Sequence, residues 1–267
     1  MRAIDIRITS GEAGFLRIKT VFKKNWKHYL QEAIGLAIFM MSACLFAGML
    51  ESNHGLLHNL IPEPLTRSII TGALMGATAL FIFYSPLTSP SGSHINPAVT
   101  ISFLRLGKMC HWDALFYILF QFAGGTVAVY IMAILMRDVL TAPPVNFVVT
   151  VPGKSGSLAA AITELIIAFI TMTIVLFTSE NEKLKKFSRI ITACLVCCYV
   201  IFAGPISGFG MNPARSFASA LPANIWTGFW IYAFVPFLGM LSATEAFLLR
   251  KRKKYITIKY TLNQKKK

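Results

Sequence analysis

The chain is short of charge, and above all of acidic charge. Of its 267 residues only 14% are charged, with 11 Asp and Glu against 26 Lys and Arg. Soluble domains usually carry about a quarter charged residues. With 55% hydrophobic residues and a mean hydropathy of +0.61, the apolar surplus is too large for one aqueous core. A soluble globular fold is therefore excluded, and lipid must be the solvent for much of the surface.

Cysteine and histidine are also scarce, with five of each. No cysteine stands at a metal-site spacing from a histidine, and His94 has no second His, Cys or acid at such a spacing. No nucleophile and base form a recognisable set. We therefore expect no disulfide framework, no metal, no cofactor and no enzymatic activity. Most of the cysteines lie inside apolar runs and are predicted to be packing residues: Cys44, Cys194, Cys197 and Cys198.

The net charge of +15 is concentrated at the two ends of the chain. Seven Lys and Arg lie in residues 1–28 and nine in residues 250–267. Basic residues are not interleaved with aromatic ones in a groove-like pattern, which a nucleic-acid binder would need. Nucleic acid is therefore excluded as a partner. Basic clusters beside apolar runs indicate membrane topology and contacts with anionic lipid.

Six apolar stretches approach the roughly 20 residues that a helix needs to cross a bilayer. We predict spans at 29–50, 68–87, 112–136, 157–178, 189–206 and 225–249. The two termini and the second and fourth connections carry 22 Lys and Arg, whereas the first, third and fifth connections carry 4. By the positive-inside rule, both termini are predicted to be cytoplasmic in an integral plasma-membrane protein. Residues 1–28 would form a cytoplasmic segment, 29–249 the membrane domain and 250–267 a solvated basic tail.

One short motif occurs in both halves of the chain. Residues 91–98 read Ser-Gly-Ser-His-Ile-Asn-Pro-Ala, and residues 207–214 read Ser-Gly-Phe-Gly-Met-Asn-Pro-Ala. Each copy opens an apolar segment, 97–106 or 213–221, that is long enough to cover only about half a bilayer. Three spans separate equivalent points, so the second half must run inverted relative to the first. The sequence predicts two inverted halves, about 29–136 and 157–249, with two re-entrant half-helices that meet near the membrane centre.

Asn followed by Pro suits the start of a helix. Asn is a favoured N-cap, and Pro at the first helical position gives up only an N–H that has no partner there. When the Asn oxygen caps the helix, its amide N–H₂ group is left to point into a lumen. Asn96 and Asn212 would then place two donors at the centre of a pore, backed by two positive helix ends. Such a site welcomes a water or hydroxyl oxygen and repels cations and protons.

The two motifs resemble the signature loops of the aquaporin, or major intrinsic protein, family. The likeness rests on Asn96-Pro97-Ala98 and Asn212-Pro213-Ala214 with their flanks, and on Glu32, Gln121 and Glu164 within their spans. The resemblance implies an all-α membrane protein, a right-handed bundle of six tilted transmembrane helices plus two half-helices. It also implies one pore per chain and assembly as a homotetramer.

The resemblance further implies an extracellular constriction of four residues. These correspond to Arg215, Phe209, Val200 and, on the second span, Gly76, or Met75 if the loop before Asn96 carries one inserted residue. Small residues at two of the positions and an aromatic wall are similar to glycerol-conducting members. At four other positions the chain instead resembles water channels: Ser216, Ala220, Phe229 and Trp230. We expect a passive channel for water and small neutral solutes such as glycerol or urea, with a strictly water-selective channel as an alternative.

Glu32 and Glu164 leave a second alternative open. Ionisable residues inside spans indicate a functional site by default, and inverted repeats with broken helices also build proton-coupled transporters. The twin placement, one glutamate in each half, favours a supporting role in which each carboxylate accepts N–H bonds from its own re-entrant loop.

Overall fold

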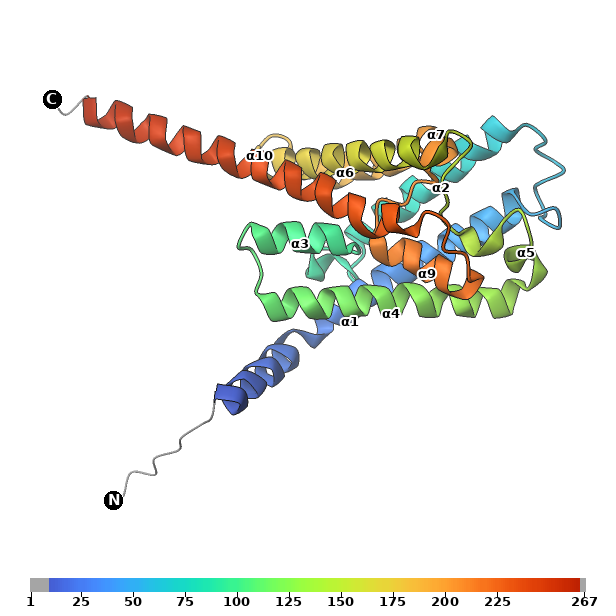
Figure 1. Ribbon diagram of the computed structural model, residues 1–267, viewed down its shortest axis with the longest axis horizontal. Helices are drawn as coiled ribbons and strands as arrows, with labels where there is room; N and C mark the ends of the chain where they lie inside the picture. The colour runs from blue at the N-terminus through green and yellow to red at the C-terminus, as the bar shows by residue number, and fades with distance from the viewer. Residues whose placement is uncertain (1–9, 265–267) are drawn as a thin grey trace, which may run out of the picture.

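The computed structural model describes residues 10–264, with side chains from 18 to 252, and all regular elements in that range are helical. The prediction of an all-α protein is confirmed. Six longer helices run along the molecule (Figure 1): α1 (Ser10–Leu50), α2 (Pro64–Tyr84), α4 (His111–Met136), α6 (Gly156–Glu180), α7 (Ser188–Phe202) and α10 (Phe229–Gln264).

Shorter elements connect the long helices. The two predicted half-helices are α3 (Pro97–Arg105) and α9 (Pro213–Ala223), close to their expected bounds. The others are α5 (Asp138–Thr141), α8 (Gly204–Ser207) and three 3₁₀ turns, η1 (Ser89–Ser91), η2 (Asn146–Val148) and η3 (Lys185–Phe187).

Five of the six predicted spans are continuous helices that are long and apolar enough to cross a membrane, namely α1, α2, α4, α6 and α10. The remaining span, predicted at 189–206 and fifth in chain order, is divided into α7 and α8 at Ala203. Pro205 lies in the first turn of α8. Because a proline has no backbone N–H, Pro205 cannot donate to the Ile201 carbonyl oxygen, and its ring crowds that carbonyl, so α7 ends at Phe202.

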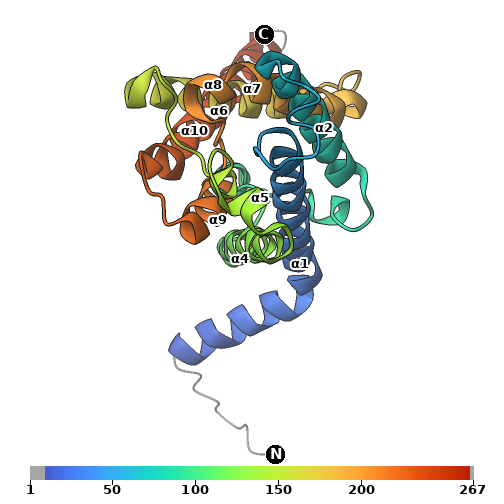
Figure 2. The same cartoon turned by 90° about the vertical axis from the view of Figure 1, so that its right-hand side faces the viewer.

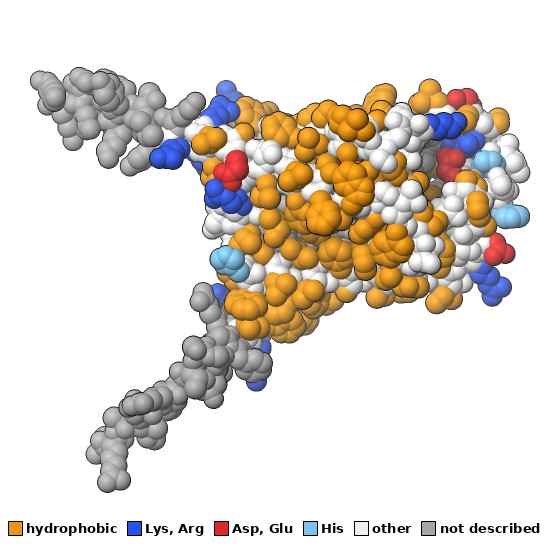
Figure 3. All heavy atoms as spheres, viewed as in Figure 1, with side chains coloured by type: hydrophobic (Ala, Val, Ile, Leu, Met, Phe, Trp, Pro, Cys, Tyr) orange, Lys and Arg blue, Asp and Glu red, His pale blue; other side chains and the backbone are white. Residues whose placement is uncertain are grey.

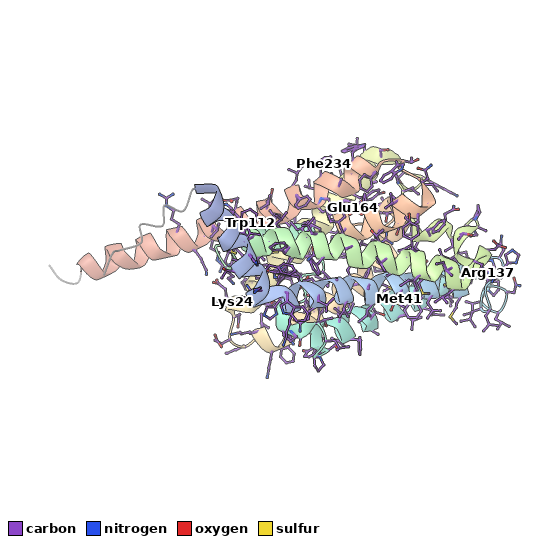
Figure 4. All side chains as sticks on the ribbon, turned by 90° about the horizontal axis from the view of Figure 1, so that it is seen from below. Lys24, Met41, Trp112, Arg137, Glu164 and Phe234 are labelled. Carbon is purple, nitrogen blue, oxygen red and sulfur yellow. The ribbon has the colours of Figure 1, made fainter. Side chains whose placement is uncertain are left out.

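The described surface carries a wide apolar band with charged side chains at its two ends (Figure 3). Large apolar residues in this band are well exposed, among them Phe234 at 65% and Ile134 at 74%. In a soluble protein a patch of this size would be a liability, whereas in lipid it is the required surface. Trp112 and Arg137 mark the opposite ends of α4 (Figure 4).

The two halves of the chain pack by exchanging their half-helices. Within each half the first long helix packs on the last one, α1 on α4 and α6 on α10. The half-helices cross over: α3 packs on α10, and α9 packs on α4. Figure 1 shows α3 and α9 approaching from opposite ends of the bundle and meeting near its middle. This is the inverted arrangement that the repeated motif predicts.

The N-terminal turns of α1 bend away from the bundle (Figures 1 and 2). Where α1 joins the bundle, Asp113 at the start of α4 accepts hydrogen bonds from Tyr29 Oη at 2.6 Å and Asn25 Nδ2 at 2.9 Å. The first described turns of α1 and the last described turns of α10 lie at this same end of the molecule (Figure 1). The predicted solvated tail continues α10 as far as Gln264, while Lys265 to Lys267 lie outside the described residues.

Glycines allow the helices to approach closely, as the sequence indicates for a bundle in lipid. A Cβ on Gly72 would lie 2.8 Å from the Cys197 carbonyl oxygen on α7. A Cβ on Gly124 would lie 2.2 Å from the carbonyl oxygen of Ala33, where α4 crosses α1.

Gly124→Ala is therefore expected to destabilise the protein. Because the neighbouring atom is backbone, the two helices must move apart, at a cost of roughly 1–3 kcal/mol. The measurement is the thermal unfolding midpoint of the purified protein in detergent. The control is Ile134→Ala on the same helix, because that side chain is 74% exposed and no helix contact is lost. Equal melting of both variants would contradict the close contact of α1 and α4.

Candidate channel site

Each Asn-Pro-Ala turn begins one half-helix, and the predicted N-caps are confirmed. Asn96 Oδ1 accepts a hydrogen bond from the Ala98 N–H at 2.8 Å. Asn212 Oδ1 accepts from the N–H groups of Ala214 at 3.1 Å and Arg215 at 3.3 Å. Pro97 and Pro213 occupy the first helical positions, where a missing N–H costs nothing. Ala98 and Ala214 are fully buried, so the two helix starts pack without bulk between them.

The two turns are joined by a reciprocal pair of hydrogen bonds. Asn96 Nδ2 donates to the Met211 carbonyl oxygen at 2.9 Å, and Asn212 Nδ2 donates to the Ile95 carbonyl oxygen at 2.6 Å. The sequence led us to expect a wholly free amide N–H₂ on each asparagine. Instead, one N–H of each amide holds the opposite loop, and the second N–H remains for another acceptor, because a carboxamide has two donors.

Glu164 on α6 supports the loop that leads into α9. Its carboxylate accepts hydrogen bonds from Ser207 Oγ at 2.7 Å and from the N–H groups of Gly210 at 2.8 Å and Met211 at 2.5 Å. The side chain lies inside the bundle (Figure 4) and is completely buried. A buried carboxylate is tolerated only when it is fully hydrogen-bonded, and here the loop provides the donors.

Glu32 on α1 supports the first loop in the same way. It accepts from Ser91 Oγ at 2.6 Å and from the N–H groups of His94 at 3.0 Å and Ile95 at 2.5 Å. A fourth donor, Gln121 Nε2, lies 2.8 Å away on α4. Both re-entrant loops therefore rest on a buried carboxylate from the first helix of their own half.

Two tyrosines that the sequence analysis missed hold the same loops from the other side. Tyr117 Oη donates to the Ser91 carbonyl oxygen at 2.8 Å, and Tyr232 Oη donates to the Ser207 carbonyl oxygen at 2.6 Å. They follow these serines by 26 and 25 residues. This nearly equal spacing from the two motifs was the signal available in the sequence.

The backbone just before each asparagine is not helical, and several of its carbonyl groups have no hydrogen-bond donor among the described residues. Left-handed conformations recur at matching positions, with φ of 49° at Ser93 and Phe209, 42° at Ile95 and 48° at Met211. Among the described residues, none donates a hydrogen bond to the carbonyl groups of 92–94 or 208–210. Such strained, unpaired backbone is tolerated at membrane depth only where it lines a polar cavity.

A cavity of about 330 Å³ runs past both asparagines. Its lining includes Ser188 and Arg189 at the start of α7, Ala47 near the end of α1 and Thr71 in the first half of α2. Residues 92–96 and 208–212 contribute to its lining. Most of the other lining residues are apolar, among them Phe39, Ala43, Ala79, Phe83 and Val196, and the polar ones include Thr71, Thr171 and Thr192.

Three of the four predicted filter residues line this cavity, and the fourth does not. Val200, Phe209 and Arg215 are among the lining residues, and so is Met75. Gly76, the first choice on the second span, faces α7 instead, where its Cβ would lie 3.0 Å from Cys197 Cβ. Gly76 is therefore corrected to a helix-contact position, because the next residue along a helix points about 100° away.

Arg215 brings an unpaired cation to the cavity. The side chain is half-buried, and no described residue accepts a hydrogen bond from its buried Nη1. In contrast, the cavity lining does not include the four residues whose types match the water-channel pattern: Ser216, Ala220, Phe229 and Trp230.

Comparison with known proteins identifies the family. Residues 19–247 match the model of the major intrinsic protein family. The chain is 33% identical over 171 residues to Aquaporin NIP1-2 of Arabidopsis thaliana, covering 62% of this chain and 58% of that one. It is 30% identical over 215 residues to a probable NIP-type aquaporin of Nicotiana alata, covering 73% of this chain and 78% of that one.

The fold has a counterpart among solved structures. An aquaglyceroporin from Plasmodium falciparum superimposes with a TM-score of 0.68 at 19% identity, covering 82% of this chain and 93% of that one. The chain thus spans little more than half the length of the Arabidopsis relative, yet nearly all of the solved channel. Taken with the family model and the paired Asn-Pro-Ala turns, these likenesses establish that the chain belongs to the major intrinsic protein family.

Proposed function

We propose that this protein is a passive transmembrane channel for water and small neutral solutes such as glycerol or urea. The observation that carries the proposal is the composition of the cavity wall. Two asparagine amides and two loops with unpaired carbonyls line the same cavity as a mostly apolar set of side chains. A molecule that carries hydroxyl or amide groups on one side and carbon on the other fits such a wall. The names of the relatives, aquaporin and aquaglyceroporin, agree with this reading.

The loop carbonyl groups and the asparagine amides together replace the hydrogen bonds that a permeating molecule makes with bulk water. Carbonyl oxygens accept from the O–H groups of a passing molecule, while the free N–H of Asn96 and of Asn212 donates to its oxygen. Both donors stand at the positive ends of α3 and α9, so an excess proton or a cation is repelled where the two helices meet. Neutral molecules pass with little cost in desolvation.

The outer constriction in this proposal consists of Met75, Val200, Phe209 and Arg215. Arg215 would donate hydrogen bonds to a solute oxygen and add a second barrier to cations. The three apolar residues would contact the carbon side of the solute. Valine at position 200 leaves a wider opening than an aromatic side chain or a histidine would. The wider opening favours solutes larger than water.

The channel would work as a homotetramer in the plasma membrane with both termini in the cytoplasm. The orientation is supported by the excess of Lys and Arg in the termini and in the even-numbered connections. Residues 1–28 and 250–267 would then lie on the cytoplasmic side of the 29–249 membrane domain. The exposed apolar residues of the described helices offer a surface for lipid or for neighbouring copies.

A proton-coupled transporter is a weaker proposal on the same fold. It would need Glu32 or Glu164 to exchange protons with the permeation path. Both carboxylates already accept hydrogen bonds from loop N–H groups and a serine, which favours a fixed supporting role. Flux that depended on a proton gradient would favour the transporter over the channel.

The test is stopped-flow light scattering of proteoliposomes with water, urea and glycerol. We expect all three to permeate well above protein-free vesicles, with a low activation energy and no dependence on a pH gradient. Permeation of water alone would reduce the proposal to a strictly water-selective channel. Vesicles no more permeable to water than the lipid control would refute the channel itself.

Val200→His is expected to narrow the constriction. An imidazole is larger than an isopropyl group and adds a polar edge, so glycerol permeability should fall by more than tenfold while water permeability falls less. Loss of a single well-placed contact or gain of a clash changes such selectivity by about 1–3 kcal/mol. The measurement is the glycerol-to-water permeability ratio in the same vesicles. An equal loss of both permeabilities would count against Val200 as a filter residue.

A further inference from the structure

The connection between α5 and α6 contains the most strained backbone in the described chain. Asn146, Phe147 and Val148 follow one another in left-handed conformations, with φ of 44°, 56° and 52°. Asparagine tolerates this region, but a bulky aromatic residue and a β-branched valine rarely adopt it. Strain of this kind persists only where the surroundings impose it, and it concentrates at functional positions.

The connection is clamped on both sides of the strained residues. On the C-terminal side, the Gly153 N–H donates to the Ile206 carbonyl oxygen at 3.0 Å. The Val151 carbonyl oxygen lies so close to Gly208 that a Cβ there would be only 2.9 Å away. On the N-terminal side, Val145 is 6% exposed and packs in the core between α1 and α4. The strained turn therefore has a fixed place beside the loop that leads to Phe209.

The clamped turn points one side chain into the channel cavity. Val148 is among the lining residues, whereas Asn146 and Phe147 are not. Val148 also packs against both large core clusters, one of which contains Met75 and Phe209. The η2 turn that contains Val148 contacts α9, the helix of Arg215, and α1, the helix of Ala47.

We propose that Val148 is a further specificity-determining residue, a wall of the outer constriction contributed by the α5–α6 connection. Its branched side chain narrows the opening beside Phe209 and so limits the size of the solute. Glycine would suit the left-handed backbone better. The chain instead presents an isopropyl group, whose branching at Cβ restricts its χ1 rotation and makes a well-defined wall. The inference rests on the proposed channel function and adds a residue to its filter.

The experiment compares three variants in proteoliposomes with water, urea, glycerol and the four-carbon polyol erythritol. Val148→Gly should raise the glycerol-to-water permeability ratio several-fold and admit erythritol, with no fall in the thermal unfolding midpoint, because strain is relieved. Val148→Ile should lower the same ratio below that of the unmodified protein. Asn146→Gly is the matched control, since it makes the backbone of the same turn more mobile without changing a residue of the cavity lining, and its ratio should stay unchanged.

The outcomes separate this inference from the proposed function. If the unmodified protein passes only water but Val148→Gly admits glycerol, the solute range proposed above falls while the role of Val148 stands. An unchanged ratio in both Val148 variants would overturn the role of Val148. The same increase in Asn146→Gly as in Val148→Gly would also overturn it, because mobility of the connection would then explain the change. If Val148→Gly does not fold, Val148→Ala replaces it with the same expectations.

Discussion

Glu164→Ala is expected to abolish water permeability and to lower the stability of the fold. Removal of the carboxylate leaves the N–H groups of Gly210 and Met211 and the Ser207 hydroxyl without their acceptor. Each unsatisfied buried donor costs about 1–3 kcal/mol, so a loss of roughly 3 kcal/mol or more is expected. Without this support the loop before Asn212 no longer keeps the left-handed conformations of Phe209 and Met211. The carbonyl groups of residues 208–210 then no longer line the cavity. Stopped-flow water permeability and the unfolding midpoint in detergent measure the two effects.

The matched control lies on the same helix. Glu180 forms an ion pair with Lys251, and both side chains are about half exposed. Exposed pairs contribute about 0–1 kcal/mol, so Glu180→Ala should leave permeability unchanged and the midpoint nearly so. The water permeability and unfolding midpoint of Glu164→Gln should lie between those of Glu164→Ala and Glu180→Ala. The glutamine amide oxygen still accepts hydrogen bonds, but its N–H₂ group faces other donors. Normal water flux through Glu164→Ala would rule out the supporting role.

Asn212→Asp is expected to make the channel leak protons or cations while it stays folded. Aspartate is as good an N-cap as asparagine, so α9 should keep its start. The substitution removes the amide that donates to the Ile95 carbonyl oxygen and places a carboxylate between the positive ends of α3 and α9. A negative charge there lowers the barrier that the helix ends raise against cations. We expect the proton flux to rise by at least about tenfold, which corresponds to about 1.4 kcal/mol in the barrier.

Proton flux is measured with a pH-sensitive dye inside proteoliposomes after an external pH jump. Asn224→Asp is the matched control, because it makes the same chemical change at the exposed C-cap of α9, away from the cavity. Its proton flux should equal that of the unmodified protein. If Asn212→Asp stays as proton-tight as Asn224→Asp, proton exclusion does not depend on the electrostatics of the paired asparagines.

Much of the channel architecture follows from local rules. Apolar runs of membrane-spanning length, an Asn-Pro start and an apolar segment too short to cross lipid each have one favourable structure. Because Glu32 and Glu164 are buried charges, they must find donors, and the nearest unpaired N–H groups belong to the re-entrant loops of their own halves. For the same reason, Asn96 and Asn212 were predictable as caps from the residues that follow them.

Local rules do not extend to contacts that depend on how two helices are rotated against each other. The choice between Gly76 and Met75 is such a case, since one residue along α2 turns a side chain by about 100°. The bonds from Tyr117 and Tyr232 to Ser91 and Ser207 depend likewise on the crossing of helices distant in sequence.

By itself, the sequence determined the membrane environment, the inverted repeat, the two capped half-helices and the carboxylate beneath each loop, because these depend on hydrophobicity, spacing and short-range hydrogen bonding. Only the tertiary structure decided which residues face the cavity, how the asparagines bond across it, and that Val148 reaches it from a clamped turn. These features depend on the rotation and packing of segments more than a hundred residues apart, such as Asn96 and Met211. Such placement is set by the whole bundle and is not encoded in any one stretch of chain.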